Sequence, residues 1–412
     1  MDFFIIGLSH HRAPVSLRER LPPPEALDAA FQRLHGRRDG LAESLILSTC
    51  NRLEVLAVSG QPQAAARAVT ETLGLSPAEL GPSLHQYFGL EAARHLFRIS
   101  AGLDSLVLGE PQILGQVKAA FRESVRLGRA GALLNKLMHR AFRAAKRVRG
   151  ETPLGGGAVS VAGAAVALAR SLWGGELAGA RAVILGAGSM AALAADNLQK
   201  RAATQLTIIS RTLAKAEALA ARLGAAVRPW ADLETALVQA DLVIAAAAAR
   251  SPVLSAENLG PALNLRPARP LFLIDIGVPR NIAHDVKRLE NVVLRNIDDL
   301  NEVVWENRLN RAGAADEAEA LIDAEVEKFG QWLARQAHQP TLAALTRKAE
   351  AIRRLELKKT LKQHDFDSDQ RAALEIMTAA LVRRLLHDPL LFIKNSSAQG
   401  DCVQSIRRAF NL

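Results

Sequence analysis

Apolar positions near the N-terminus alternate between strand-like runs and helical spacing. Continuous apolar runs at residues 3–8, 44–47 and 55–58 predict three strands, and helical spacing at 24–34 and 64–73 predicts two helices. The resulting βαββα order is typical of a small antiparallel α+β domain, in which helices cover a face of the sheet.

A second pattern begins after a long helical stretch at residues 91–149. The turn-forming segment 152–157, Thr-Pro-Leu-Gly-Gly-Gly, predicts a domain boundary. Beyond it an Ala/Val-rich helix precedes an apolar run at 182–185, and helices then alternate with short apolar runs. This alternation predicts a parallel sheet with helices on its faces. Its further strands are predicted at 205–209, 242–246, 271–276 and 292–294.

Residues 298–335 contain no proline and only two glycines, and they keep an apolar helical stripe. The stripe consists of Ile322, Val326, Phe329 and Leu333. A single helix of that length would extend on the order of 50 Å, which suits a connection between modules better than a core. After Pro340, amphipathic helices are predicted at 342–361, 370–386 and 403–410. Such a terminal module either dimerises or docks on its own chain.

The composition is that of a folded protein, and its charge is compatible with a polyanionic partner. Its 412 residues are 49% hydrophobic and 23% charged, which favours two or three domains. The net charge of +10 predicts a polyanionic binding partner, with nucleic acid as the first candidate. The alternative is a basic surface that is only solvated. Cations at i, i+4, i+7 and i+11 form one helical stripe that would suit phosphates or simply solubilise a face. The stripe is Lys136, Arg140, Arg143 and Arg147.

The sequence predicts a protein that has no membrane-spanning segment and lies in a reducing compartment. Two cysteines cannot form a disulfide framework. The N-terminal run lacks a basic flank and is too short for a signal peptide, and no run approaches about 20 apolar residues. We therefore expect a cytoplasmic protein.

Cys50 lies in the pentapeptide Ser-Thr-Cys-Asn-Arg, residues 48–52, between two predicted strands. A tight turn there would present side chains to a ligand from a rigid base. Arg52 would lower the pKa of the Cys50 thiol from about 8.5 and favour the reactive thiolate. The alternative is a small hydrophobe that closes a strand.

Histidines and one loop offer further candidate chemistry. His10 and His11 are adjacent, but no Cys or carboxylate stands at ligand spacing, so no metal site is predicted. His95 falls on or beside the buried face of a helix, where a satisfied core histidine is the alternative to a functional one. The loop at 102–112 combines Gly, Pro, Glu and Gln before a new helix, and such a loop would suit a substrate amine and carbonyl.

A dinucleotide fingerprint follows the strand at 182–185. The segment Gly186-Ala187-Gly188-Ser189-Met190-Ala191 reads G-x-G-x-x-A between a strand and a helix, which is the context a pyrophosphate-binding loop requires. The next strand ends without the acidic residue that would hold a ribose 2′-hydroxyl. Hydroxyls and cations stand there instead, which favours NADP. These residues are Ser210, Arg211, Thr212 and Lys215.

A thiolate and an NADP domain on one chain predict thioester chemistry. The thiol would attack an activated acyl group, and hydride would reduce the thioester to an aldehyde. The motifs of this chain closely resemble the glutamyl-tRNA reductase family, which makes glutamate-1-semialdehyde for tetrapyrrole synthesis. The resemblance covers nearly all of residues 1–330. It rests on GLSHHRAPVSLRER (7–20), LSTCNR (47–52), GLDSLVLGEPQILGQVK (102–118), GGGAVSVA (155–162), the glycines at 186 and 188, Ser-Arg-Thr (210–212) and DIGVPRNI (275–282).

The resemblance implies roles for individual residues. Cys50 is similar to the nucleophile that takes the glutamyl group from the tRNA ester, and His95 to the histidine that matters for activity. Thr49, Asn51 and Arg52 match its substrate-holding neighbours, with Arg52 reaching the glutamate carboxylate. Further substrate contacts are implied for Ser105, Glu110, Pro111, Gln112 and Gln116. NADPH is implied at residues 186–191, with its 2′-phosphate at Arg211.

The resemblance also implies an α/β multidomain architecture. It comprises an α+β catalytic domain (1–152), a Rossmann-like NADPH domain (153–296), a long spinal helix (297–339) and a helical dimerisation domain (340–412). The family is a V-shaped homodimer that uses no flavin or metal, and glutamate-1-semialdehyde aminomutase is an implied partner.

Two positions depart from the family pattern, and two rival functions remain open. Ala191 replaces the third glycine of the fingerprint, and the alanines at 245–249 stand where hydroxyl-bearing residues commonly face the nicotinamide. The rivals are a dehydrogenase of a small free acid with a structural Cys50, and a basic nucleotide-sensing protein. Aldehyde produced from glutamyl-tRNA but not from free glutamate would exclude the dehydrogenase of a free acid. Turnover that depends on Cys50 would exclude the nucleotide-sensing protein.

Overall fold

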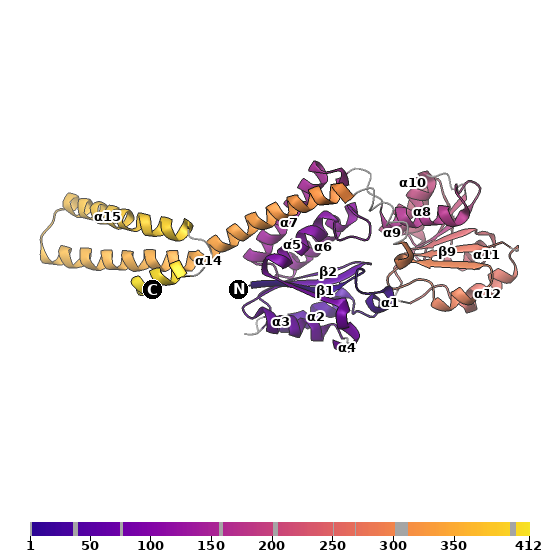
Figure 1. Ribbon diagram of the computed structural model, residues 1–412, viewed down its shortest axis with the longest axis horizontal. Coiled ribbons are helices and arrows are strands. Elements are labelled where there is room, and N and C mark those ends of the chain that lie inside the picture. The colour runs from indigo at the N-terminus through magenta and orange to yellow at the C-terminus, as the bar shows by residue number, and fades with distance from the viewer. Residues whose placement is uncertain are drawn as a thin grey trace. The chain divides into compact units, whose positions relative to one another are not determined.

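The computed structural model describes residues 2–35, 40–74, 77–155, 160–200, 205–249, 251–267, 269–300, 312–395 and 401–412. The chain forms two compact units, residues 1–325 and 326–412. The first unit contains two sheets, and the second is helical in its described residues (Figure 1).

The N-terminal sheet has four antiparallel strands in the order β2-β3-β1-β4. Their bounds are β1 Asp2–Ser9, β2 Glu43–Ser48, β3 Arg52–Ser59 and β4 Leu84–Phe88. Helices α2 (Pro24–Leu34) and α3 (Pro62–Thr72) cover one face. The other face carries α5 (Gly89–Ala101), α6 (Pro111–Arg126) and α7 (Ala132–Glu151) (Figure 1). The predicted α+β domain is confirmed, but β4 was missed because its sequence, Leu-His-Gln-Tyr-Phe, is short and half polar.

The second sheet has six parallel strands in the order β10-β9-β8-β5-β6-β7, so the strand order reverses beside β5. The predicted strands are found as β5 Arg181–Leu185, β6 Gln205–Ile209, β8 Leu242–Ala245, β9 Leu271–Asp275 and β10 Val292–Asn296, and β7 (Ala226–Arg228) was not predicted. Helices α8 (Val161–Trp173), α9 (Ser189–Lys200) and α10 (Leu213–Leu223) pack on one face. Helices α11 (Leu233–Gln239) and α12 (Ala256–Asn264) pack on the other. Ligands bind such sheets at the carboxyl ends of the strands, where the order reverses.

The long helix differs from the prediction at both ends. Residues Ile297–Leu300 form a 3₁₀ turn, residues 301–311 lie outside the described residues, and α14 then runs without interruption from Ala312 to Gln363. The expected break after Pro340 is wrong. A proline removes one backbone hydrogen bond, and burial of neighbouring Leu342 and Leu345 offsets that loss.

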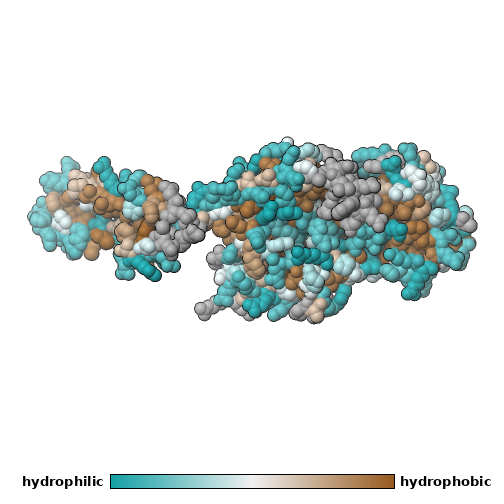
Figure 2. All heavy atoms as spheres, viewed as in Figure 1, coloured by the Kyte–Doolittle hydropathy of each residue, from teal (hydrophilic) through white to brown (hydrophobic). Residues whose placement is uncertain are grey.

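The second unit pairs α14 with α15 (Ser368–Asn395), and α16 (Asp401–Ala409) follows. Its small core contains Leu342, Leu345, Leu386 and Ile393. Apolar side chains also gather on the surface of this helix pair, where they line a groove of about 720 Å³ (Figure 2). No helix in the described part of the chain has the length and apolar character to cross a membrane.

Candidate functional site

Cys50 lies in the tight turn that joins β2 to β3, as its position between two apolar runs predicted. Thr49 shapes this turn. Its Oγ1 accepts the N–H groups of Asn51 (3.1 Å) and Arg52 (3.2 Å). The N–H of His10 donates to the Asn51 carbonyl at 2.8 Å, which ties the turn to the loop after β1. The thiol therefore projects from a fixed base.

The side chain of Cys50 packs at the border between the two sheet domains. It contacts an apolar cluster that contains Val15 and Val107 of the first domain and Ile276 and Ile297 of the second. An acyl group on this sulphur would lie within reach of both domains.

The expectation that Arg52 makes the thiol acidic is wrong. Burial and the Glu110 carboxylate raise the pKa of Cys50 to about 11, although Arg18 and Arg52 act in the opposite direction. The thiol therefore needs a proton acceptor when it reacts.

Arg52 is engaged by two carboxylates, which explains its weak effect on the thiol. Its Nη1 donates to Glu54 Oε1 at 3.0 Å and to Asp104 Oδ2 at 2.8 Å, and its Nη2 donates to the Asp104 carbonyl. Burial alone would raise the pKa of Asp104, but His11 and Arg52 hold it well below its usual range. The predicted contact of Arg52 with a substrate carboxylate stays a prediction.

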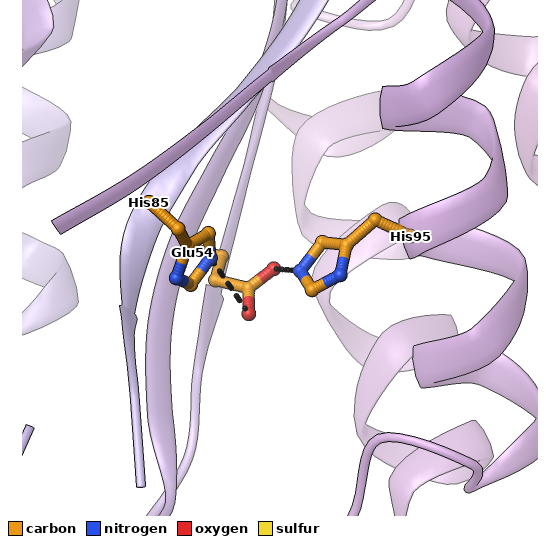
Figure 3. A group of neighbouring side chains, drawn as sticks. All are labelled: Glu54, His85 and His95. Atoms are coloured by element: carbon orange, nitrogen blue, oxygen red, sulfur yellow. Dashed lines mark hydrogen bonds and ion pairs between the residues drawn. The ribbon is translucent and has the colours of Figure 1, made fainter. Parts of the chain in front are cut away.

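Three side chains, Glu54, His85 and His95, form a buried trio between the sheet and helix α5 (Figure 3). Glu54 and His85 come from strands β3 and β4, and His95 comes from α5. His95 Nε2 lies 3.0 Å from Glu54 Oε2, and His85 Nε2 lies 3.4 Å from Oε1. Gly7 of the central strand pairs with Glu54 on one side and His85 on the other, so the two side chains meet over a residue without Cβ. Burial would raise the pKa of Glu54, but His95 and Arg52 hold it far below its usual range.

The trio has the ligand set of a zinc site, because its three ligand atoms lie within 4.8 Å of one another. The Arg52 guanidinium is 3.0 Å from the same carboxylate, however, and its fixed positive charge opposes a cation there. We therefore interpret the trio as a hydrogen-bonded support that orients His95. His10 remains a neutral imidazole, since burial lowers its pKa to about 2.

The loop before α6 brings a carboxyl group toward Cys50. Burial raises the pKa of Glu110 to about 7, although its hydrogen bond from the Val161 backbone opposes that rise. Ser105 is buried, and the buried Gln112 amide nitrogen has no hydrogen-bond partner among the described residues. Pro111, Gln112 and Gln116 lie in the first two turns of α6.

The predicted dinucleotide loop joins β5 to α9, at the edge where ligands are expected. Gly186 has φ +118°, and a Cβ there would lie 2.6 Å from the Ala246 carbonyl oxygen, so only glycine fits. At Gly188 a Cβ would meet nothing within 4 Å, which leaves the loop open to a pyrophosphate. The remaining predicted residues of the loop are Ala187, Ser189, Met190 and Ala191.

The residues predicted for a 2′-phosphate follow the adjacent strand, β6. Arg211 is exposed, and its Nη2 donates to the Ala248 carbonyl at 2.6 Å. Ser210 Oγ accepts the N–H of Thr212 at 3.3 Å, and Lys215 lies in the first turn of α10. Two hydroxyls and two cations thus follow one strand end, and their contact with an anionic ligand stays a prediction.

Asn281 lies in the segment 275–282 that the sequence analysis quoted without giving this residue a role. It holds the Ala-rich loop after β8. Asn281 is fully buried, and its side chain exchanges hydrogen bonds with the Ala247 N–H (2.7 Å) and carbonyl (3.0 Å). Asp275 in turn accepts the N–H groups of Gly277, Asn281 and Ile282. Hydrogen bonds from the Asn281 side chain to the Ala247 backbone thus shape this loop.

Two of the four cations in the predicted phosphate-binding stripe on α7 form ion pairs with carboxylates of the same chain. Arg140 and Arg147 each lie 3.2 Å from the buried Glu325 of α14, and Arg147 also pairs with Glu151. These two arginines therefore pair with the long helix, and the interpretation of the stripe as a nucleic-acid surface stays a prediction. Arg143 is exposed and keeps that candidate role.

The fold and site together define a class of protein. A parallel sheet with a dinucleotide-type loop adjoins a domain that presents a cysteine at the domain border and holds a buried histidine against a carboxylate. This is the arrangement of a nicotinamide-dependent oxidoreductase with a thiol at the domain border.

Comparison with known proteins narrows the class. Family models match residues 6–152 (Glutamyl-tRNAGlu reductase, N-terminal domain), 167–303 (Shikimate / quinate 5-dehydrogenase) and 317–412 (Glutamyl-tRNAGlu reductase, dimerisation domain). The glutamyl-tRNA reductase of Syntrophotalea carbinolica is 43% identical and that of Desulfovibrio desulfuricans 40%. Both alignments cover 100% of this chain, with 95% and 97% of the relatives.

A solved structure shares the architecture. The glutamyl-tRNA reductase of Methanopyrus kandleri is 31% identical with a TM-score of 0.51, over 100% of this chain and 99% of that one. The chain belongs to the glutamyl-tRNA reductase family, so the resemblance found in its motifs is confirmed.

Proposed function

We propose that this chain reduces glutamyl-tRNA to glutamate-1-semialdehyde with NADPH through a thioester on Cys50, the first step of tetrapyrrole synthesis. The observation that carries the proposal is the place of Cys50. It projects from a rigid turn into a cluster shared by the catalytic and nucleotide-binding domains. The same acyl group can then be accepted in one domain and reduced by a cofactor held in the other.

In the first step the Cys50 sulphur attacks the ester carbonyl of glutamyl-tRNA. With the pKa of Cys50 raised to about 11 and that of Glu110 to about 7, we assign Glu110 as acceptor of the thiol proton. The ribose oxygen leaves with a proton, for which His95, held by Glu54, is the candidate donor. The product is a thioester and free tRNA.

In the second step the thioester carbon accepts hydride and the carbon–sulphur bond breaks. Bound NADPH supplies that hydride. Gly186 and Gly188 would admit its pyrophosphate, and Arg211 its 2′-phosphate. The Cys50 thiolate leaves and recovers its proton, and the aldehyde is released. The proposed substrate contacts remain Thr49, Asn51, Arg52, Ser105, Glu110, Pro111, Gln112 and Gln116.

We further propose a cytoplasmic homodimer formed through the C-terminal helices. Ile352 and Leu355 of α14 and Ile376, Leu381 and Leu385 of α15 are all exposed beside the apolar groove. A second copy of this unit would remove them from water, which is favourable by about 25 cal/mol per Å². The labile aldehyde would be handed to glutamate-1-semialdehyde aminomutase.

One assay tests the reaction. The purified chain is given glutamyl-tRNA and NADPH, and the semialdehyde is measured, with free glutamate as the control substrate. Aldehyde from the tRNA ester alone supports the proposal, and aldehyde from free glutamate contradicts it. Cys50→Ser should abolish the product, whereas Cys402→Ser should not.

A further inference from the structure

We propose that Arg18 and Asp298 form a clamp that positions the Cys50 turn and couples it to the nucleotide-binding domain. The clamp would serve hydride transfer more than thioester formation. This inference rests on the proposed function and adds two positioning residues to it.

Arg18 ends the short helix α1 (Val15–Arg18), and its side chain is only 3% exposed. Each of its three guanidinium nitrogens has an acceptor. Nε donates to the Ala13 carbonyl at 3.0 Å, Nη1 to the Cys50 carbonyl and Nη2 to Asp298 Oδ1 at 2.7 Å. The planar fork therefore joins the backbone of the proposed nucleophile to one carboxylate.

Asp298 belongs to the other domain. It lies in the 3₁₀ turn Ile297–Leu300 that directly follows β10, and its N–H donates to Asn296 Oδ1 at 2.7 Å. Ile297 and Leu300 are buried in the cluster that Cys50 contacts. Asp298 Oδ2 also accepts the N–H of Val15 at 2.9 Å. One carboxylate therefore binds the first residue of α1, Val15, and the last, Arg18.

A second ion pair adjoins the clamp. Glu19 Oε2 lies 2.8 Å from Arg280 Nε, in the loop after β9. Consecutive residues of the catalytic domain thus reach two separate loops of the nucleotide-binding domain. Arg18, Glu19, Thr49, Val278 and Pro279 line one cleft of about 430 Å³ there.

The two halves of the clamp predict different defects. Thioester formation needs the Cys50 turn, which Arg18 holds directly. Hydride transfer needs the nucleotide-binding domain in register with that turn, which requires Asp298. A misplacement of about 1 Å can reduce a rate about 10²-fold.

The experiment compares two activities of each full-length variant. One is glutamate release from glutamyl-tRNA without NADPH, which reports thioester formation and hydrolysis. The other is semialdehyde formation with NADPH. Asp298→Ala should lower the ratio of reduction to release about tenfold to a hundredfold, with an unchanged Kd for NADPH. Arg18→Met should lower both activities. Arg20→Ala is the matched control, because Arg20 pairs with Glu79 on the surface of the catalytic domain.

An Asp298→Ala ratio equal to that of the parent, or a parallel fall of both activities with Tm, would overturn the clamp. If Asp298→Ala fails to fold, Asp298→Asn, which keeps the shape without the charge, is measured in the same way and judged by the same ratio. A parent without either activity would instead refute the proposed function.

Discussion

Gly7→Ala tests whether the buried trio supports the reaction. Gly7 lies in the middle of β1, directly between Glu54 of β3 and His85 of β4. A Cβ at this position would overlap the Leu53 carbonyl oxygen and would lie 2.7 Å from both Cα and Cγ of Glu54. Two of these atoms, the Leu53 oxygen and the Glu54 Cα, belong to the backbone of the paired strand. Rotation of the Glu54 side chain alone would therefore not relieve the overlap.

The expected cost follows from these contacts. Overpacking a close-packed interior costs about 1–3 kcal/mol. If Glu54 withdraws from Arg52 (3.0 Å), a buried charge loses one partner, which costs about 3–5 kcal/mol. Asp104 stays paired with Arg52 and offsets part of the second cost, so we expect about 3 kcal/mol in total, below the sum of the two ranges. Since about 1 kcal/mol shifts Tm by roughly 2–4 °C in a domain of this size, the first transition should fall by roughly 6–12 °C.

The assay combines thermal unfolding with glutamate release and aldehyde formation. Gly7→Ala should lower both activities, because His95 loses its support, and should leave NADPH binding intact. Gly115→Ala is the control. Its Cβ would meet nothing within 4 Å in helix α6, so it should stabilise the chain by about 0.5–1 kcal/mol. A Gly7→Ala protein with the activity and Tm of the parent would refute the role of the trio.

Three further predictions concern the cofactor, the thiol and the tRNA. Arg211→Ala should narrow the preference for NADPH over NADH about 10- to 150-fold in kcat/KM, because a charge-assisted hydrogen bond contributes about 1.5–3 kcal/mol; an unchanged ratio excludes the site. Glu110→Gln should speed alkylation of Cys50 by iodoacetamide above pH 7, where the parent carboxylate is ionised and raises the thiol pKa, and change it little below pH 6. Turnover should fall in the same variant, because the thiol loses its proton acceptor. An unchanged alkylation rate above pH 7 would contradict the effect of the Glu110 charge on the thiol pKa. Arg143→Ala should reduce the salt slope of tRNA binding by about 1, whereas the paired Arg147 should affect docking of α14 instead; equal slopes return Arg143 to a solvated face.

Local patterns predicted the elements that depend on neighbouring residues. The turn at Cys50 and the loop at Gly186 follow from apolar runs that end in residues of defined backbone preference. The buried trio was missed because Glu54, His85 and His95 are far apart in sequence, and Glu54 and His85 meet only through their strand register with Gly7. A glycine and a glutamate inside apolar strands were the available signals.

Charge was the least predictable property. The prediction of an acidic thiol was wrong because the burial of Cys50 and the nearby Glu110 carboxylate were unknown, and because Glu54 and Asp104 engage Arg52. The pairing of Arg140 and Arg147 with Glu325 was not predictable for a similar reason, since Glu325 lies far along the chain. A cation in a sequence shows its charge but not the carboxylate that neutralises it.

The most direct test of the account follows labelled glutamate from tRNA to protein with NADPH absent. An activated ester needs no reductant for thiol attack, so label should accumulate as a thioester and map to the peptide that contains Cys50. Later addition of NADPH should convert it to aldehyde. Label on Cys402, or full reductase activity in the Cys50→Ser protein, would contradict the mechanism.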